Sequence, residues 1–425
     1  MKNRNRYFID SYEGGEAAIL IQVDFHQSKF QSEFEEFREL ALSAGVKVLS
    51  MMEARRLQPT AKYFLGEGKA QELAEQVKAL EAEVVLVNHD LSAAQQRNLE
   101  NLCHCRVVDR TALILDIFAS RARSFEGRLQ VELAQLEHLR TRLVRGWTHL
   151  ERQKGGIGLR GPGETQLESD KRMIGLRIKA IKNELKLVLK QREQRRRARV
   201  RAEIPTLSLV GYTNAGKSSV FNRLTQANVY AADQLFATLD PTLRKLTLPK
   251  LGKIILADTV GFIRDLPHEL VAAFRATLEE TQLADLLLHV MDSHEEDIAD
   301  IRAEVDLVLK SIEADQIPQL LIYNKIDLRA GAQPRIDRNS EGKPWRVWLS
   351  AKTGEGFDLL EQALVEILGE GMLQTEVRLG PESGKLRAEL YALKVIKNEI
   401  LLDEGGWLLK LEIPAADYKR FFPGF

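Results

Sequence analysis

Apolar positions along the first 125 residues alternate between short continuous runs and stretches in which they recur at helical spacing. The runs at 17–25 and 84–87 predict buried strands, and the stretch 30–42, with three phenylalanines on one face, predicts an amphipathic helix. Alternation of this kind is typical of an α/β domain with a mainly parallel sheet, which we assign to residues 1–125. Further strands are predicted at 46–49 and 106–108, and further helices at 69–80, 92–102 and 111–119.

Residues 126–203 show a longer repeat, because apolar side chains keep to one helical face over two extended stretches that begin near Leu129 and Ile174. This pattern predicts a helical hairpin. Between the two helices, residues 155–163 contain five glycines in nine positions. A connection between paired helices needs only about 2–5 residues, so the length of this glycine-rich segment favours a functional loop.

From residue 204 to 370, short apolar runs again alternate with helical stretches, which predicts a second α/β domain, doubly wound around a parallel sheet. We assign the last segment, 371–425, to a small C-terminal α+β domain. Its apolar runs are interpreted as strands or as a strand–helix–strand unit with a turn at Gly405-Gly406, and they lie at 375–379, 386–395 and 407–413.

The composition narrows the class of protein, since 44% of the 425 residues are apolar and 29% are charged, as in ordinary soluble globular chains. No apolar run approaches the roughly 18–20 residues that span a bilayer, so we expect no membrane insertion. The cysteines Cys103 and Cys105 are the only two in the chain, which indicates a reducing compartment and a cytoplasmic protein. His104 between them allows a metal-binding interpretation, but no second ligand pair lies nearby and inert thiols are preferred.

The net charge of zero, from 61 basic and 61 acidic residues, conceals a strongly basic segment. Residues 126–203 carry 20 Lys or Arg against 10 Asp or Glu, a net of +10, which favours a polyanionic partner. A solvated helix face is the alternative, but residues 168–201 carry 13 basic against 4 acidic side chains, more than pairing along a helix neutralises. Contact with a phosphate backbone is the better interpretation, and the near absence of aromatic residues favours structured RNA over single strands. The residues that we assign to RNA contact are Arg152, Lys154, Gly155, Gly156, Gly158, Arg160, Gly161, Gly163, Arg195, Arg196 and Arg197.

A complete phosphate-binding loop follows the predicted strand 206–210 and precedes a predicted helix, 219–224, which is the context that this motif requires. Glycines let its backbone N–H groups surround an anion at the helix N-terminus. Lys217 would place its charge on the β- and γ-phosphates, and the Ser218 hydroxyl would ligate Mg²⁺. The motif GxxxxGK[ST] is matched by Gly211-Tyr212-Thr213-Asn214-Ala215-Gly216-Lys217-Ser218.

Three further motifs follow in order, each at the end of a predicted strand, where doubly wound sheets bind their ligands. They are Asp258-Thr259-Val260-Gly261, Asn324-Lys325-Ile326-Asp327 and Ser350-Ala351-Lys352. Asp258 would hold Mg²⁺ through water, and Gly261 would offer its N–H to a γ-phosphate. Asp327 would accept hydrogen bonds from the ring N–H and amino group of guanine, a donor pair that adenine lacks. The four motifs together predict a Ras-like P-loop domain that binds and hydrolyses GTP.

Four segments carry a closer resemblance to a known family. They are Tyr63-Phe64-Leu65-Gly66-Glu67-Gly68-Lys69, the segment GGIGLRGPGETQ at 155–166, Phe236-Ala237-Thr238-Leu239-Asp240, and Asp258-Thr259-Val260-Gly261-Phe262. Through them the chain, from about residue 7 to 370, resembles the HflX-type ribosome-associated GTPases of the translation-factor class. The glycine-rich segment is the most specific of the four.

The resemblance implies roles for single residues. Thr238 is similar to the switch I threonine that completes the Mg²⁺ shell around a γ-phosphate, so Ser218 and Thr238 are the expected metal ligands. Asn214 matches an asparagine that helps to coordinate a monovalent cation in some related GTPases, which implies a K⁺ requirement. Phe262 stands where many GTPases have a glutamine that orients the attacking water. We therefore assign no catalytic residue and expect slow intrinsic hydrolysis that a partner stimulates. The nucleotide-binding residues that we predict are the four motifs together with Phe236, Ala237, Thr238, Leu239 and Asp240.

The resemblance also implies a partner and a function. It identifies the polyanion as the large ribosomal subunit, with the hairpin reaching ribosomal RNA near the peptidyl transferase centre. The expected function is the GTP-dependent separation of stalled or idle 70S ribosomes into subunits, by a cytoplasmic, partly ribosome-associated monomer in a stress response. Two alternatives stay open. One is a GTPase of large-subunit assembly, and the other is an RNA-remodelling ATPase or GTPase with a second nucleotide site at Gly66-Glu67-Gly68, where a turn entering a helix is the simpler interpretation.

Overall fold

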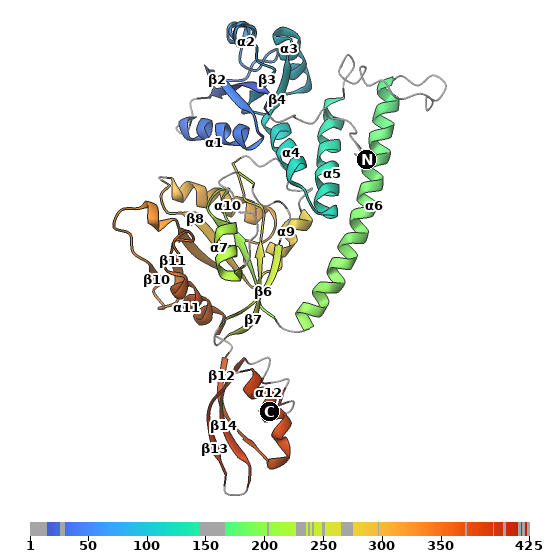
Figure 1. Ribbon diagram of the computed structural model, residues 1–425. Helices are drawn as coiled ribbons and strands as arrows, with labels where there is room; N and C mark the ends of the chain where they lie inside the picture. The colour runs from blue at the N-terminus through green and yellow to red at the C-terminus, as the bar shows by residue number, and fades with distance from the viewer. Residues whose placement is uncertain are drawn as a thin grey trace. The chain divides into compact units, whose positions relative to one another are not determined.

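The structure is a computed structural model of the chain. It describes residues 15–25, 30–143, 166–201, 204–226, 235–236, 239, 242–248, 251–264, 275–295, 297–369, 372–393, 395–402, 405–414, 418 and 421–422. Two compact units make up the chain (Figure 1). The first consists of 1–192, 232–240 and 263–276, and the second of 193–231, 241–262 and 277–425.

The N-terminal domain of the first unit is built on a parallel sheet with the strand order β2-β1-β3-β4. Its elements are β1 (Ala17–Asp24), α1 (Phe30–Ser43), β2 (Lys47–Arg55), α2 (Glu67–Leu80), β3 (Val84–Val87), α3 (Ala93–Cys103), β4 (Arg106–Asp109) and α4 (Arg110–Arg121). The predicted alternation of strand and helix is confirmed. Strand β2 is longer than predicted, because buried Met52 and Ala54 alternate with exposed Glu53 instead of forming a continuous apolar run.

Local signals define the starts of the helices in this domain. Ser92 caps α3, since its hydroxyl accepts from the Gln95 N–H at 3.2 Å while the Gln95 side chain accepts from the Ser92 N–H. Gly66 is the N-cap of α2 with a φ of 92°, and a Cβ there would lie 2.0 Å from the Arg56 guanidinium. The structure therefore forms a turn entering a helix at the predicted GxG.

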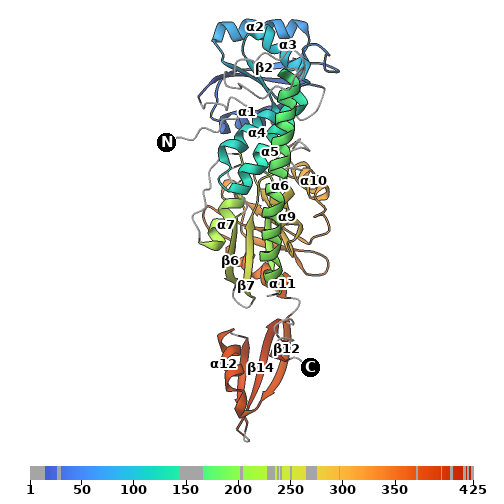
Figure 2. The same cartoon turned by 90° about the vertical axis from the view of Figure 1, so that its right-hand side faces the viewer.

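Two long helices complete the first unit: α5 (Phe125–Arg142) and α6 (Gln166–Arg201), of which α6 extends beyond residue 192 into the second unit. They lie side by side (Figures 1 and 2) and share a cluster of buried leucines and isoleucines. Arg177 pairs with Glu132, and Lys182 pairs with Glu137, both at 2.7 Å. The helices of the predicted hairpin therefore pack together, and the glycine-rich connection at 155–163 lies outside the described residues.

The second unit contains a seven-stranded sheet in the order β10-β11-β9-β8-β5-β7-β6. The five central strands run parallel, and the two edge strands, β10 and β6, are antiparallel to their neighbours. Its elements are β5 (Thr206–Val210), α7 (Lys217–Thr225), β6 (Thr242–Leu248), β7 (Gly252–Asp258), α9 (Arg275–Gln282), β8 (Leu286–Asp292), α10 (Ile298–Ser311), β9 (Gln319–Asn324), the 3₁₀ helix η2 (Ile326–Leu328), β10 (Arg335–Arg338), β11 (Pro344–Trp348) and α11 (Phe357–Leu368). The strand order reverses at β5, so the chain that follows β5 lies where doubly wound sheets bind their ligands.

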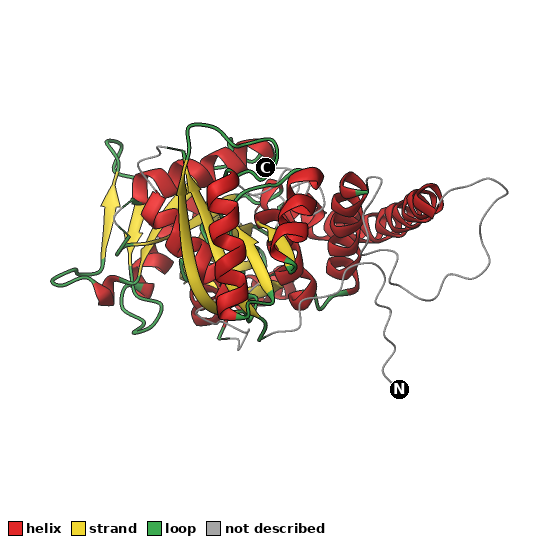
Figure 3. Ribbon diagram, turned by 90° about the horizontal axis from the view of Figure 1, so that it is seen from above, coloured by secondary structure: helices red, strands yellow, loops and turns green. Residues whose placement is uncertain are grey.

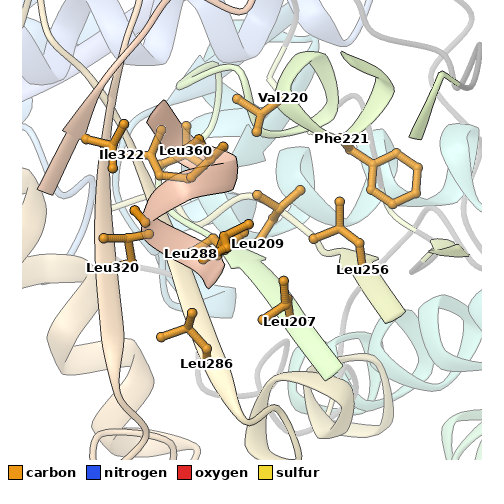
Figure 4. Packing of buried hydrophobic residues seen from close by; sticks show 14 of the residues in the cluster. Leu207, Leu209, Val220, Phe221, Leu256, Leu286, Leu288, Leu320, Ile322 and Leu360 are labelled. Carbon is orange, nitrogen blue, oxygen red and sulfur yellow. The ribbon is translucent and has the colours of Figure 1, made fainter. Parts of the chain in front are cut away.

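Buried aliphatic side chains hold helices α7 and α11 against one face of this sheet. Leu207 and Leu209 of β5 lie at the centre, and Phe221 of α7 and Leu360 of α11 pack onto them (Figure 4). Figure 3 shows the strands in yellow with helices in red beside them. Burial of one such side chain stabilises the fold by about 1.5–3 kcal/mol, so the centre of the sheet is a rigid base for the segments at its edge.

The C-terminal region is a separate antiparallel sheet in the order β12-β14-β13. Its elements are β12 (Met372–Leu379), η4 (Pro381–Ser383), α12 (Gly384–Ala392), β13 (Ile396–Leu401) and β14 (Trp407–Pro414). Leu390 of α12 packs on Leu409 and Leu411 of β14. The predicted apolar run 386–395 is therefore mostly helical, and β13 is an additional strand.

The predicted fold class is confirmed: an α/β domain and a Ras-like P-loop domain with a central sheet are followed by a small α+β region. The domain boundaries stay predictions. Among the helices of the described residues, none is both long and apolar enough to cross a membrane.

Candidate nucleotide-binding site

The predicted phosphate loop connects the central strand β5 to helix α7, and its glycines are required by the local packing. Gly211 has a φ of 139°, and a Cβ there would lie 2.1 Å from the Val290 carbonyl oxygen. Gly216 caps α7 with a φ of 91°, and a Cβ there would lie 2.2 Å from Nδ2 of Asn324. The loop is thus pressed against the ends of β8 and β9, and its backbone follows a path that only glycine adopts without strain.

Lys217 is the charged centre of the loop. Its side chain is buried, and its Nζ donates to the Tyr212 carbonyl at 2.6 Å. Burial lowers the pKa of Lys217 to about 8, and the nearby Asp258 carboxylate partly opposes this shift. An ammonium group that has lost its water in this way is strongly attracted to a phosphate.

Ser218 and Asp258 bring together the oxygen atoms that a magnesium site needs. The Ser218 hydroxyl donates to Oδ2 of Asp258 at 2.8 Å, and Asp258 is fully buried at the end of β7. A hydroxyl beside a carboxylate is a donor set that suits Mg²⁺, so these residues fit the ion. When bound, Mg²⁺ would neutralise charge on the β- and γ-phosphates. The second predicted ligand, Thr238, lies outside the described residues.

Asn324 ties the phosphate loop to the motifs predicted for guanine. Its Nδ2 donates to the Ala215 carbonyl at 3.0 Å, and its Oδ1 accepts from the Ala351 N–H at 2.9 Å. The Ser350 hydroxyl donates to Oδ1 of Asp327 at 2.6 Å, which orients that carboxylate. Three motifs that are far apart in the sequence are therefore brought to one edge of the sheet, as predicted.

The segment predicted to sense the γ-phosphate lies directly on the phosphate loop. Gly261 lies so close to the phosphate loop that a Cβ at this position would be 2.9 Å from the Lys217 Nζ and from Cγ2 of Thr213. The Phe262 N–H donates to the Gly211 carbonyl at 3.1 Å, and the Thr213 N–H donates to the Phe262 carbonyl at 2.7 Å. The Phe262 side chain is 2% exposed. Its ring packs inside the protein, which agrees with the expectation that this residue does not orient a water molecule.

Asn214 lies on the open side of the loop. It is exposed with a φ of 60°, and it borders a pocket beside the loop. The pocket is lined by Tyr212, Thr213, Asn214, Ala215, Met291, Asp292, Glu295, Ile298, Ile301 and Lys325. Asp292 pairs with Lys325 at 2.7 Å, and burial raises the pKa of Glu295. Sequence reasoning missed Asp292, although it ends strand β8 as the motif residues end their strands.

The predicted switch residues 236–240 are described only in part. The Phe236 ring packs on Phe118 of α4 with 4.6 Å between the ring centroids, and Leu239 is buried. Ala237, Thr238 and Asp240 lie outside the described residues, so the nucleotide contacts of this segment stay predictions.

The residues predicted for RNA contact also lie largely outside the described part of the chain. Arg152, Lys154, Arg160 and the five glycines belong to the undescribed connection, whereas Arg195, Arg196 and Arg197 lie on helix α6.

The two cysteines are free thiols, of which Cys103 is buried and Cys105 half-buried. Within the described residues, no group of three or more His, Cys, Asp or Glu side chains is arranged to hold a metal ion.

Known proteins resemble this chain over nearly its full length. Three family models match it: GTP-binding GTPase N-terminal over residues 31–119, GTP-binding GTPase Middle Region over 121–199, and 50S ribosome-binding GTPase over 206–325. GTPase HflX of Escherichia coli (strain K12) is 57% identical over 411 residues, which cover 97% of this chain and 96% of that protein. GTPase HflX of Magnetococcus marinus is 45% identical over 390 residues, covering 90% and 89%.

Among solved structures, a GTP-binding protein of Sulfolobus solfataricus in complex with GDP is 24% identical, over 83% of this chain and 98% of that one, with a TM-score of 0.44. The identity to the two bacterial relatives agrees with the site, in which the phosphate loop, the Ser218–Asp258 pair and the Asp327 carboxylate are all in place. The protein is a GTP-hydrolysing enzyme, and its chain belongs to the HflX family of GTPases.

Proposed function

We propose that this GTPase binds the large ribosomal subunit and separates stalled or idle 70S ribosomes into subunits in a GTP-dependent way. The observation that carries the proposal is a nucleotide switch joined to one long basic helix. Helix α6 has 36 residues, a length of about 54 Å at 1.5 Å per residue. The description of the family model over residues 206–325, a 50S ribosome-binding GTPase, supports the same partner.

The charges of α6 support contact with RNA. Lys179, Lys186 and Lys190 are exposed along its length, while Arg177 and Lys182 face Glu132 and Glu137 of α5. One face of the helix is therefore occupied by the hairpin partner, and the exposed lysines remain for phosphates. Each neutralised phosphate releases counterions, so binding should weaken steeply as the salt concentration rises.

The nucleotide would control this interaction through the segments around Thr238 and Gly261. GTP with Mg²⁺ would order both segments, and hydrolysis would loosen them and permit release. We further propose that K⁺ binds at Asn214, that ribosomes stimulate the slow intrinsic hydrolysis, and that the protein is cytoplasmic and partly ribosome-associated. Equal turnover in sodium and potassium buffers would remove the K⁺ proposal.

Light scattering of purified 70S ribosomes tests the proposed function. Mixing with this protein and GTP should lower the scattering, GDP should not, and a non-hydrolysable GTP analogue should still split ribosomes if hydrolysis serves release. Shortening the glycine-rich segment 155–163 should abolish splitting while GTP hydrolysis by the free protein continues. Unimpaired splitting by that variant would refute the role of the loop.

Charge reversal separates RNA contact from general charge effects. The triple change of Lys179, Lys186 and Lys190 to Glu should weaken co-sedimentation with 50S subunits. A matched control reverses Lys253 and Lys310, which are exposed in the second unit, and should bind normally. Co-sedimentation with 50S subunits but no splitting would favour the assembly GTPase.

The remodelling alternative has its own test. ATP hydrolysis that survives in the Lys217→Met variant would indicate a second nucleotide site in the N-terminal domain.

A further inference from the structure

Asp292 and Lys325 form an ion pair where the central strands β8 and β9 end. The two strands run parallel with Asp292 beside Asn324, and the Ser293 N–H donates to the Asn324 carbonyl at 2.9 Å. Asn324 in turn holds the phosphate loop through the Ala215 carbonyl at 3.0 Å. The ends of both strands are therefore fixed to each other and to the loop, and all of these residues belong to the second compact unit.

Both oxygen atoms of the Asp292 carboxylate have a partner. Oδ2 lies 2.7 Å from the Lys325 Nζ, and Oδ1 accepts from the His294 N–H at 2.9 Å. The side chains of Asp292 and Lys325 are 13% and 26% exposed, so water screens this pair less than it screens a pair on the open surface. The carboxylate is thus held in one orientation, and it holds the ammonium group in one place.

The backbone of Lys325 has an unusual conformation. Its φ of 62° lies in the left-handed region, and the residue is the N-cap of the 3₁₀ helix η2. Such a conformation is unfavourable for a residue with a side chain, and it persists only where the surrounding contacts hold the residue. Strain of this kind is concentrated at ligand-binding sites, and the ion pair with Asp292 is one of the contacts that hold Lys325.

The ion pair lies beside the phosphate loop. Asp292 and Lys325 line the same pocket as the loop residues from Tyr212 to Ala215. An ammonium group has three N–H donors, and the contact with Asp292 uses one of them. The other two can meet oxygen atoms of a nucleotide bound on the loop while the Asp292 carboxylate stays in place. Asp292 therefore does not have to compete with the nucleotide for Lys325.

We propose that Asp292 is a positioning residue for guanine-nucleotide binding: it holds the Lys325 ammonium group at the phosphate loop before the nucleotide arrives. A lysine side chain has four rotatable bonds, and the entropy lost when such a side chain is ordered opposes binding. The ion pair lowers this cost, because Lys325 is already ordered when the nucleotide binds. The inference rests on the binding of GTP and GDP, with Lys325 as a residue of the motif predicted for guanine, and does not depend on ribosome splitting.

The Asp292→Asn variant of the full chain tests this role, because asparagine keeps the size of the side chain and an acceptor for the His294 N–H but loses the charge. The Kd is measured with Mg²⁺ for GDP and for a non-hydrolysable GTP analogue, by competition against a fluorescent GDP. We expect both Kd values to rise about fivefold and to the same extent, since the γ-phosphate is not involved. Asp292→Glu keeps a carboxylate and should lose less affinity.

A double-mutant cycle shows whether Asp292 acts through Lys325. Lys325→Met alone should raise the Kd for both nucleotides, and adding Asp292→Asn to it should have no further effect, because the group that Asp292 positions is already gone. If the two losses of affinity add up in the double variant, Asp292 does not act through Lys325 and the proposal is overturned.

Asp285→Asn is the matched control, since it removes the same charge just before β8 begins, at the opposite end of the strand. Asp285 accepts from the Thr206 N–H at 2.7 Å, so the variant also changes a hydrogen bond of the sheet but should leave both Kd values unchanged. The proposal is likewise overturned if Asp292→Asn binds GDP as tightly as the wild type or more tightly, or if Asp285→Asn weakens binding to the same extent.

Discussion

The backbone N–H of Thr213 donates to the carbonyl of Phe262 over 2.7 Å, which joins the phosphate loop to the residue after the Asp258–Gly261 motif. The bond from the Phe262 N–H to Gly211 makes a second link. Both links use the backbone, and the Phe262 ring is buried. At this position the chain therefore contributes a fixed backbone path, and the group that orients water has to come from elsewhere.

Replacing Phe262 by glutamine should not create a faster enzyme. The side chain points into the protein, so a glutamine there would bury an amide at a cost of about 1–3 kcal/mol and lose the packing of the ring. We expect an unchanged or lower rate of GTP hydrolysis and a lower Tm, measured by phosphate release and by thermal unfolding. Phe262→Leu is the apolar control and should lose less stability. A clear gain in rate with Phe262→Gln would contradict the buried position of the ring.

The buried charge of Lys217 should lower the free energy of unfolding of the nucleotide-free protein. Burial lowers its pKa from 10.5 to about 8, so the charged form at pH 7 is disfavoured by about 3 kcal/mol at 1.36 kcal/mol per pKa unit. Lys217→Met removes this cost but also the bond to the Tyr212 carbonyl, worth about 1 kcal/mol. The variant should bind no GTP, yet its Tm without nucleotide should rise by a few degrees.

The difference in Tm between Lys217→Met and the wild type should depend on pH, because folding lowers the pKa of Lys217. Between pH 8 and 10.5 the unfolded chain binds more protons at Lys217 than the folded chain, so the wild type gains stability as the pH rises. The Tm advantage of Lys217→Met should therefore shrink above pH 8. A constant difference from pH 7 to 10 would show that the lysine is well solvated in the folded protein.

A strand is easiest to predict where its apolar residues form a continuous run. Strand β3 is four consecutive apolar residues, all buried, and this run is visible without a structure. The two edge strands of the seven-stranded sheet carry no such run. Strand β6 contains exposed Arg244 and Lys245, and β10 is the polar segment RIDR, so both were missed: their strand pairing depends on a neighbour rather than on their own apolar residues.

The residues of the nucleotide-binding site also differ in how far the sequence predicts them. Lys217, Asp258 and Asp327 were predicted because each lies in a motif whose spacing reflects contact with one ligand. Asp292 lies in no motif, and its partner Lys325 follows another strand. Only the folded sheet, which pairs β8 with β9, places the two side chains together beside the phosphate loop.

The Asp327 carboxylate should determine the choice of base. Ser350 donates to its Oδ1, and guanine offers two N–H donors to a carboxylate. Asp327→Asn replaces one acceptor by a donor, so we expect the affinity for GTP to fall at least a hundredfold and the affinity for xanthosine triphosphate, which offers an acceptor there, to rise. Competition of GTP and of xanthosine triphosphate against a fluorescent GDP measures the two affinities. Ser350→Ala should lower the affinity for both nucleotides without reversing the preference for GTP. If Asp327→Asn still prefers GTP, Asp327 does not determine the choice of base.

His289 should make the second unit sensitive to acid. It lies fully buried on the central strand β8, with Nδ1 3.3 Å from Oε1 of Gln319, and among the described residues its Nε2 has no hydrogen-bond partner. Burial lowers its pKa from 6.5 to about 4. As the pH falls below 6.5, His289 is protonated in the unfolded chain but stays neutral in the folded protein. The free energy of unfolding therefore decreases between pH 6.5 and 4, by up to about 3 kcal/mol.

A glutamine at position 289 removes this proton but keeps a polar side chain of similar size. His289→Gln should be less stable than the wild type at pH 7.5, because a well-packed strand residue is replaced, and the difference in Tm should narrow or reverse as the pH falls to 4.5. Thermal unfolding followed by tryptophan fluorescence across this range measures the difference. The control is Met291→Leu on the same strand, a buried change that involves no titratable group, so its difference in Tm from the wild type should stay constant. Parallel pH profiles for the wild type and His289→Gln would mean that His289 is protonated as easily in the folded protein as in the unfolded chain, and that β8 opens to water.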